Sequence, residues 1–68
     1  MWVTVFVIDQ KEQLSDKSFP AFQPGGKIFL YMRDAVSNTN VPVGYLIVNV
    51  FYDVNSPKPQ QYVHLSKL

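Results

Sequence analysis

The chain has no cysteine and only one histidine, so it offers neither a disulfide framework nor the cysteine and histidine sets that typically bind zinc. Charge is also scarce: 6 Lys and Arg against 5 Asp and Glu leave a net charge of +1. This balance gives no basic footprint for duplex nucleic acid. Because 47% of the residues are hydrophobic and only 16% are charged, the composition argues against intrinsic disorder.

No hydrophobic run in the chain is long enough to span a membrane as a helix. The most apolar stretch, residues 41–52, is interrupted by proline, glycine and asparagine, whereas a membrane helix needs roughly 20 apolar residues. Residues 1–8 are apolar but lack the basic start of a signal peptide and end at an aspartate. With no signal peptide, no cysteine and no transmembrane segment, we expect a cytoplasmic protein.

No pattern of reactive side chains predicts an enzyme. His64 is the sole histidine, and Ser66 shares its strand face without a third group to complete a triad. The carboxylates are scattered, so they form neither an acid–base pair nor a set of metal ligands. Gly25 and Gly26 lack the lysine and serine that complete a phosphate-binding loop. We expect no catalytic residue, no metal, no cofactor and no enzymatic activity.

The residues that are abundant predict β-strands. Residues 2–8 are almost entirely β-branched or aromatic, which suits a pleated surface. One face of this segment carries Trp2, Thr4, Phe6 and Ile8, and the other carries Val3, Val5 and Val7. Because both faces are apolar, the segment is expected to be a central strand or one covered on both sides.

Three further segments read as strands. Residues 27–33 alternate, with Lys27, Phe29, Tyr31 and Arg33 on one face and smaller aliphatic residues on the other. Residues 43–54 and 60–65 supply two more strands, and glycine or asparagine in the first of them marks a bulge. Turns are expected at residues 24–26, 37–40 and 55–59, which are rich in Pro, Gly, Asn and Ser.

The connection at residues 9–18 is ambiguous. Asp9 and Glu12 have the spacing of a capping box, which favours a short helix. Only Leu14 is apolar between residues 10 and 18, so that helix would have almost no face to bury. Overall, the chain is predicted to be a single β domain spanning residues 1–68. It is a small, mainly antiparallel sheet of four or five strands, folded as a barrel or sandwich, with a short helix within residues 9–18 as an open alternative.

Small size makes protein binding the favoured function. A chain of 68 residues buries only about 60% of its unfolded surface, so aromatic residues, 15% of this chain, are expected to anchor an interface. The first and last strands lie near the chain ends, where they can form sheet edges that pair with another copy, with Val3, Val5 and Val7 in the contact. Proline at positions 57 and 59 would block one edge. This reading predicts a homo-oligomer, most simply a dimer, that acts as a structural subunit or a stoichiometric protein inhibitor.

Binding of single-stranded nucleic acid is the alternative. Bases stack on exposed rings while a few cations follow the phosphates. The expected binding face carries Lys27, Phe29, Tyr31 and Arg33, extended by Tyr62 and His64. The competing interpretation is that Phe29, Tyr45 and Phe51 belong to the core, which would leave no such face.

Overall fold

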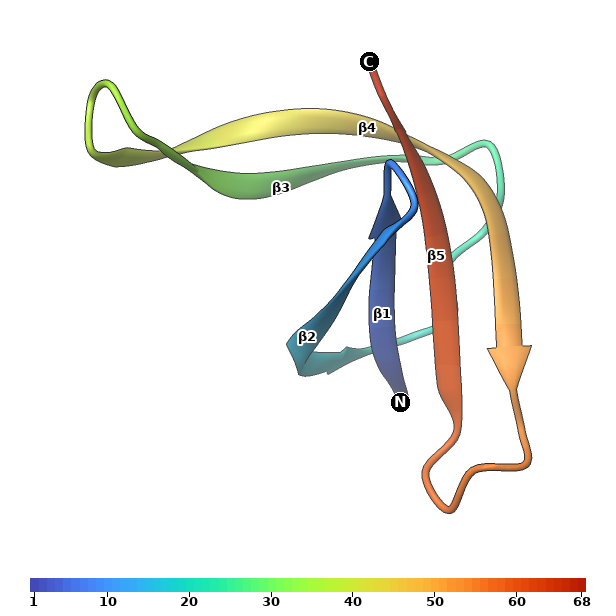
Figure 1. Cartoon of the computed structure of the whole chain (residues 1–68). Helices are drawn as coiled ribbons and strands as arrows, with labels where there is room; N and C mark the ends of the chain where they lie inside the picture. The colour runs from blue at the N-terminus through green and yellow to red at the C-terminus, as the bar shows by residue number, and fades with distance from the viewer.

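The computed structural model describes all 68 residues, which form five β-strands and no helix. The strands are β1 (Trp2–Ile8), β2 (Lys11–Phe19), β3 (Lys27–Asp34), β4 (Thr39–Asp53) and β5 (Gln60–Lys67). They make one mixed sheet in the order β2-β1-β5-β4-β3, which curls into a half-barrel (Figure 1). The predicted class, a small β-sheet or barrel of four or five strands, is confirmed.

β1 is a central strand, as the two apolar faces of residues 2–8 predicted, and the alternative that the first and last strands form sheet edges is wrong. β1 pairs with β2 on one side and, in parallel, with β5 on the other. Parallel pairing of the two chain ends satisfies the backbone of both strands internally. The prolines at positions 57 and 59 lie in the loop between β4 and β5 and therefore block no edge.

The short helix allowed within residues 9–18 is not formed, because the chain turns back at once into β2. Asp9 and Gln10 have φ angles of 51° and 65°, the left-handed values that a two-residue type I′ hairpin turn requires. This turn places Ile8 opposite Lys11 and continues the pairing to Phe19. β2 is exposed along most of its length, which explains why its sequence shows no apolar period.

β4 is the longest strand and carries the bend of the half-barrel. Its pairing with β5 shifts between Ile47 and Asn49, which is the bulge expected in this segment. Beyond the end of β5, the β3–β4 hairpin extends away from the rest of the sheet (Figure 1). We call residues 31–42 of this hairpin the arm. Among the strands, β3 contacts β4 alone.

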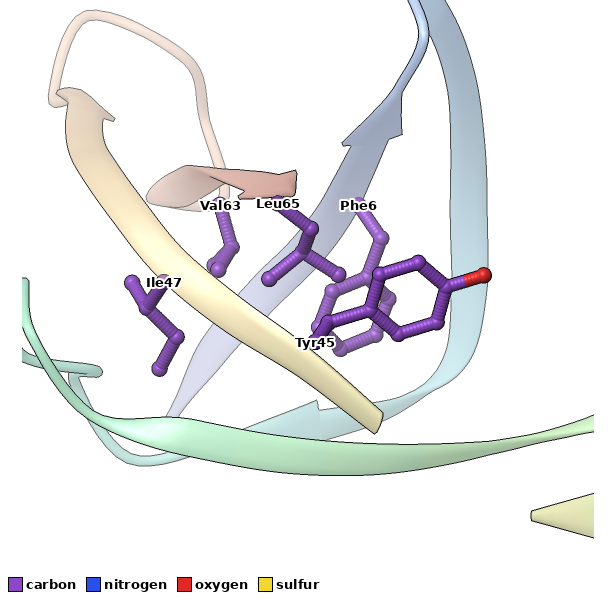
Figure 2. Close-up of a cluster of buried hydrophobic side chains, with 5 residues drawn as sticks. All are labelled: Phe6, Tyr45, Ile47, Val63 and Leu65. Carbon is purple, nitrogen blue, oxygen red and sulfur yellow. The ribbon is translucent and has the colours of Figure 1, made fainter. Parts of the chain in front are cut away.

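The core lies on the concave face of the sheet. Five buried side chains from β1, β4 and β5 point into the enclosed space in Figure 2: Phe6, Tyr45, Ile47, Val63 and Leu65. The rings of Phe19 and Phe22 extend the core, since each lies edge-on to Phe6 at a centroid distance of 6.0 Å. Aromatic pairs in these arrangements add to the energy of area burial.

The connection between β2 and β3 runs past β1 and β5 from one edge of the sheet to the other (Figure 1). Gln61 of β5, fully buried, holds it: the side-chain Nε2 donates to Pro20 O at 3.0 Å, and Oε1 accepts from Phe22 N at 3.2 Å. The predicted turn at residues 24–26 is confirmed. Gly25 has a φ of 90°, and Gly26 N donates to Gln23 O, as in a type II turn.

No segment of the structure is a long apolar helix that could cross a bilayer.

Candidate interaction site at the open edge of the sheet

β2 and β3 are the two edge strands of the sheet. Features that discourage pairing run along β2 but not along the middle of β3. Its register against β1 shifts between Val3 and Val5, so the residues between Leu14 and Ser18 bulge. Four charged side chains decorate it: Lys11, Glu12, Asp16 and Lys17. Bulges and charges are the usual protection of an exposed strand edge. β2 is therefore a poor template for another strand.

β3 has the opposite character. Its charges lie only at its ends, at Lys27 and at Arg33 with Asp34, and the five residues between them are uncharged and apolar or aromatic. Its pairing with β4 runs without a register shift from Lys27 to Asp34. A regular edge with no partner strand and with five uncharged residues in its middle is what another strand can join.

The alternation of the backbone shows which residues point their polar groups out of the β3 edge. Gly26 O accepts from Ile47 N, and Asp34 O accepts from Asn38 N, so both carbonyls face the hairpin. Alternate residues between them face the same way. The N–H and C=O groups of the remaining set therefore point outward without a partner strand: Lys27, Phe29, Tyr31 and Arg33.

The side chains of this same set lie on the convex face, as the alternation of the sequence predicted. Phe29 and Tyr31 are 70% and 73% exposed, whereas Ile28 and Leu30 on the other face pack against the core. Phe29 is thus not a core residue, and the competing interpretation is wrong for it. The result is a strip of two exposed rings between two cations.

The strip ends at an ordered hairpin tip. The carboxylate of Asp34 accepts from Val36 N at 3.1 Å and from the Ser37 hydroxyl at 2.9 Å. The backbone bond from Val36, followed by the Ser37 hydroxyl, lowers the pKa of Asp34 below its ordinary value of 3.8. Arg33 donates from Nη2 to the side-chain oxygen of Asn38, which steadies the guanidinium beside the strip.

A proline removes a hydrogen-bond donor from the other edge of the arm, on β4. Gly44 O accepts from Leu68 N on the β5 side of β4, so Pro42, two residues earlier, points its backbone the same way beyond the end of β5. Proline has no N–H to offer there. This edge of the arm is therefore a poorer template than the β3 edge, and Pro42 could not be singled out before the register of β3 and β4 was known.

A groove separates the two edge strands. It has a volume of about 600 Å³ and lies between Gln13–Lys17 of β2 and Phe29–Met32 of β3, with Phe6 at its base. The sequence did not predict this groove, because β2 was not recognised as a strand. Its β2 wall is polar apart from Leu14 and Phe19, so it differs in chemistry from the β3 wall.

Tyr62 and His64 lie on β5, away from the arm. His64 is opposite Asn49, and its ring meets Phe51 edge-on at a centroid distance of 5.2 Å. The Tyr62 hydroxyl donates to Oε1 of Gln60 at 3.1 Å. Phe51 is 56% exposed and Tyr45 is in the core, so only one of these two is a surface ring. The predicted face therefore divides into two separate groups, one on β3 and one on β4 and β5.

The predicted self-association residues belong to the middle of the sheet. Val5 is buried and lies between Leu14 of β2 and Tyr62 of β5. Val3 and Val7 on the same face are half-buried. Because β1 has a strand on each side, these valines cannot take part in edge pairing.

The chemistry of the site is that of backbone hydrogen bonding and ring contact. No three His, Asp or Glu side chains cluster in a way that would hold a metal ion.

No model of a protein family matches this chain, and comparisons with curated proteins and with solved structures find no match either.

Proposed function

We propose that this chain is a non-enzymatic protein-binding module that self-associates through the open edge of β3. One observation carries the proposal. The outward backbone groups of Phe29 and Tyr31 and their exposed rings lie together in the middle of a strand edge that has no bulge and carries charge only toward its ends. Such an edge gains main-chain hydrogen bonds and ring burial in the same contact.

The small core supports this proposal. Only 8 of 68 residues are buried, while ten large hydrophobic side chains are exposed. A monomer with so little buried surface has marginal stability, and small domains commonly gain the remainder by oligomerisation. Association in this proposal serves either an oligomeric structural subunit or a rigid inhibitor that covers another protein.

The mass of the assembly tests the proposal. Native mass spectrometry of the full chain over a range of concentrations is expected to show species at twice the 7.8 kDa chain mass or more. The dimer fraction should rise with concentration and persist at moderate salt, because strand pairing does not depend on screened surface charge. A folded protein that stays monomeric at every concentration would overturn the proposal.

Single-stranded nucleic-acid binding remains a second candidate, favoured by the β3 strip itself. Lys27 and Arg33 flank two exposed rings on one strand face, an arrangement in which bases stack on rings while cations follow phosphates. Titration of a fluorescent oligonucleotide at low salt tests it. The double variant Tyr31→Ala, Arg33→Ala should abolish binding, with Phe51→Ala as a control on the other ring group. No binding by the wild type at low salt would remove this candidate.

A further inference from the structure

We infer that β3 pairs antiparallel with β3 of a second copy across a two-fold axis that passes through Tyr31. This inference rests on the proposed function and names its partner and contact. The two half-barrels would then share one continuous ten-stranded sheet, since each contributes five strands. The contact would be isologous, with the same residues contributed by both copies.

The outward backbone groups make β3 complementary to itself. Lys27, Phe29, Tyr31 and Arg33 point their N–H and C=O groups out of the edge at every second residue. In an antiparallel pair, directly opposite residues must both point toward each other to exchange hydrogen bonds. A two-fold axis through Tyr31 meets this condition, so Phe29, Tyr31 and Arg33 each find an outward partner on the second copy.

Charge and turn geometry select Tyr31 as the axis. An axis through Leu30 would place Lys27 opposite Arg33 of the second copy, a like-charge pair that destabilises a sheet. An axis through Phe29 would extend the pairing into Gly25, whose N–H already bonds to Ile47 O. The Tyr31 axis keeps the pairing of residues 28–34 within β3 and leaves Lys27 outside the contact. It also sets each Phe29 ring beside the other copy's Arg33, a favourable cation–aromatic pairing.

The arm gives a reason for the second copy. Residues 31–42 form a two-stranded hairpin that projects beyond the sheet (Figure 1). An isolated two-stranded hairpin is marginally stable, and three or more strands are needed for independent stability. Pairing across Tyr31 would place residues 31–34 of each arm against residues 28–31 of the other copy's β3, so that the two β3–β4 hairpins form a four-stranded sheet. β2 of a second copy is a poorer partner, since its bulge and charges oppose pairing.

Disulfide cross-linking tests the contact, because the chain has no cysteine of its own. Residues opposite each other in a hydrogen-bonded antiparallel pair have Cα atoms about 5.5 Å apart, within the disulfide range. Tyr31→Cys should therefore oxidise to a covalent dimer at least tenfold faster than Phe51→Cys, the matched exposed control. Faster cross-linking of Phe29→Cys than of Tyr31→Cys would overturn the register, and no enhancement at either position would overturn the pairing.

A proline scan separates edge pairing from ring contact. Tyr31→Pro removes an outward N–H that makes no bond within the chain, whereas Tyr31→Ala removes the ring and keeps that N–H. The inference predicts that the proline variant is a folded monomer and that the alanine variant retains a measurable dimer. Suppose that the wild type dimerises, that Tyr31→Pro also dimerises, and that Tyr31→Cys and Phe29→Cys cross-link no faster than Phe51→Cys. The β3 contact is then wrong, and self-association through another surface survives. A monomeric wild type would overturn both.

Discussion

At the scale of single residues, one buried polar side chain connects β5 with β1 and with the connection between β2 and β3. Gln61 is fully buried, yet its amide is satisfied: Nε2 also donates to Thr4 Oγ1 at 3.0 Å. Its orientation is fixed, because Pro20 O can only accept and Phe22 N can only donate. The side chain therefore holds β5 against β1 and against the connection between β2 and β3.

Replacing this amide by an apolar side chain should destabilise the fold. Gln61→Leu leaves the Phe22 N–H and the Pro20 carbonyl without their partner, at a cost of about 2–4 kcal/mol in the free energy of unfolding. Urea denaturation of the variant measures this loss. Gln13→Leu, on the exposed strand β2, should change stability by no more than about 0.5 kcal/mol. Equal effects of the two substitutions would contradict the role given to Gln61.

Asp34 gives the hairpin tip a dependence on pH. Its pKa is lowered, first by the hydrogen bond from Val36 N and then by the Ser37 hydroxyl. A lowered folded-state pKa means that the carboxylate stabilises the tip above its ordinary pKa of 3.8 and that this contribution is lost as the pH falls through the folded-state value.

An NMR titration checks this pH dependence. The Asp34 carboxyl should titrate below 3.8, and the Val36 amide shift should follow the same curve. In Asp34→Asn the Val36 shift should no longer change over that range. Titration of Asp34 at or above its ordinary value would contradict the hydrogen-bonded tip.

At the scale of elements, the turn between β1 and β2 contains one residue, Gln10, that does not favour it. Gln10 has a φ of 65°, a conformation that glycine adopts without steric cost. Gln10→Gly should therefore raise the stability by about 0.5–1 kcal/mol, since Asp-Gly is a preferred type I′ pair. Thermal unfolding measures the gain. Gln13→Gly, in an extended strand, should instead lower stability, and a loss from Gln10→Gly would contradict the turn assignment.

The elements divide clearly into those that the sequence predicted and one that it did not. β1 and β3 follow from β-branched runs and period-two alternation, which local residue types determine. β2 was not predicted, because an exposed edge strand has no apolar period and its turn contains neither asparagine nor glycine. β4 begins at Thr39, before the predicted start, because Pro42 is tolerated where its missing N–H would face outward.

At the scale of the whole molecule, the order of the strands was beyond reach of sequence reasoning. β1 and β5 are separated by most of the chain, and their parallel pairing depends on packing that no local pattern encodes. The site could be predicted only in part. The faces of β3 followed from its alternation, whereas the openness of its edge follows from the strand order and from the bend of β4.

The central claim is that the β3 edge pairs with a second copy, and amide hydrogen exchange along this strand tests it most directly. In a monomer, protection should alternate, with the Ile28, Leu30 and Met32 amides protected by β4 and those of Phe29, Tyr31 and Arg33 open to solvent. We predict that raising the protein concentration protects the second set to the level of the first. Alternation that persists at every concentration would contradict the claim.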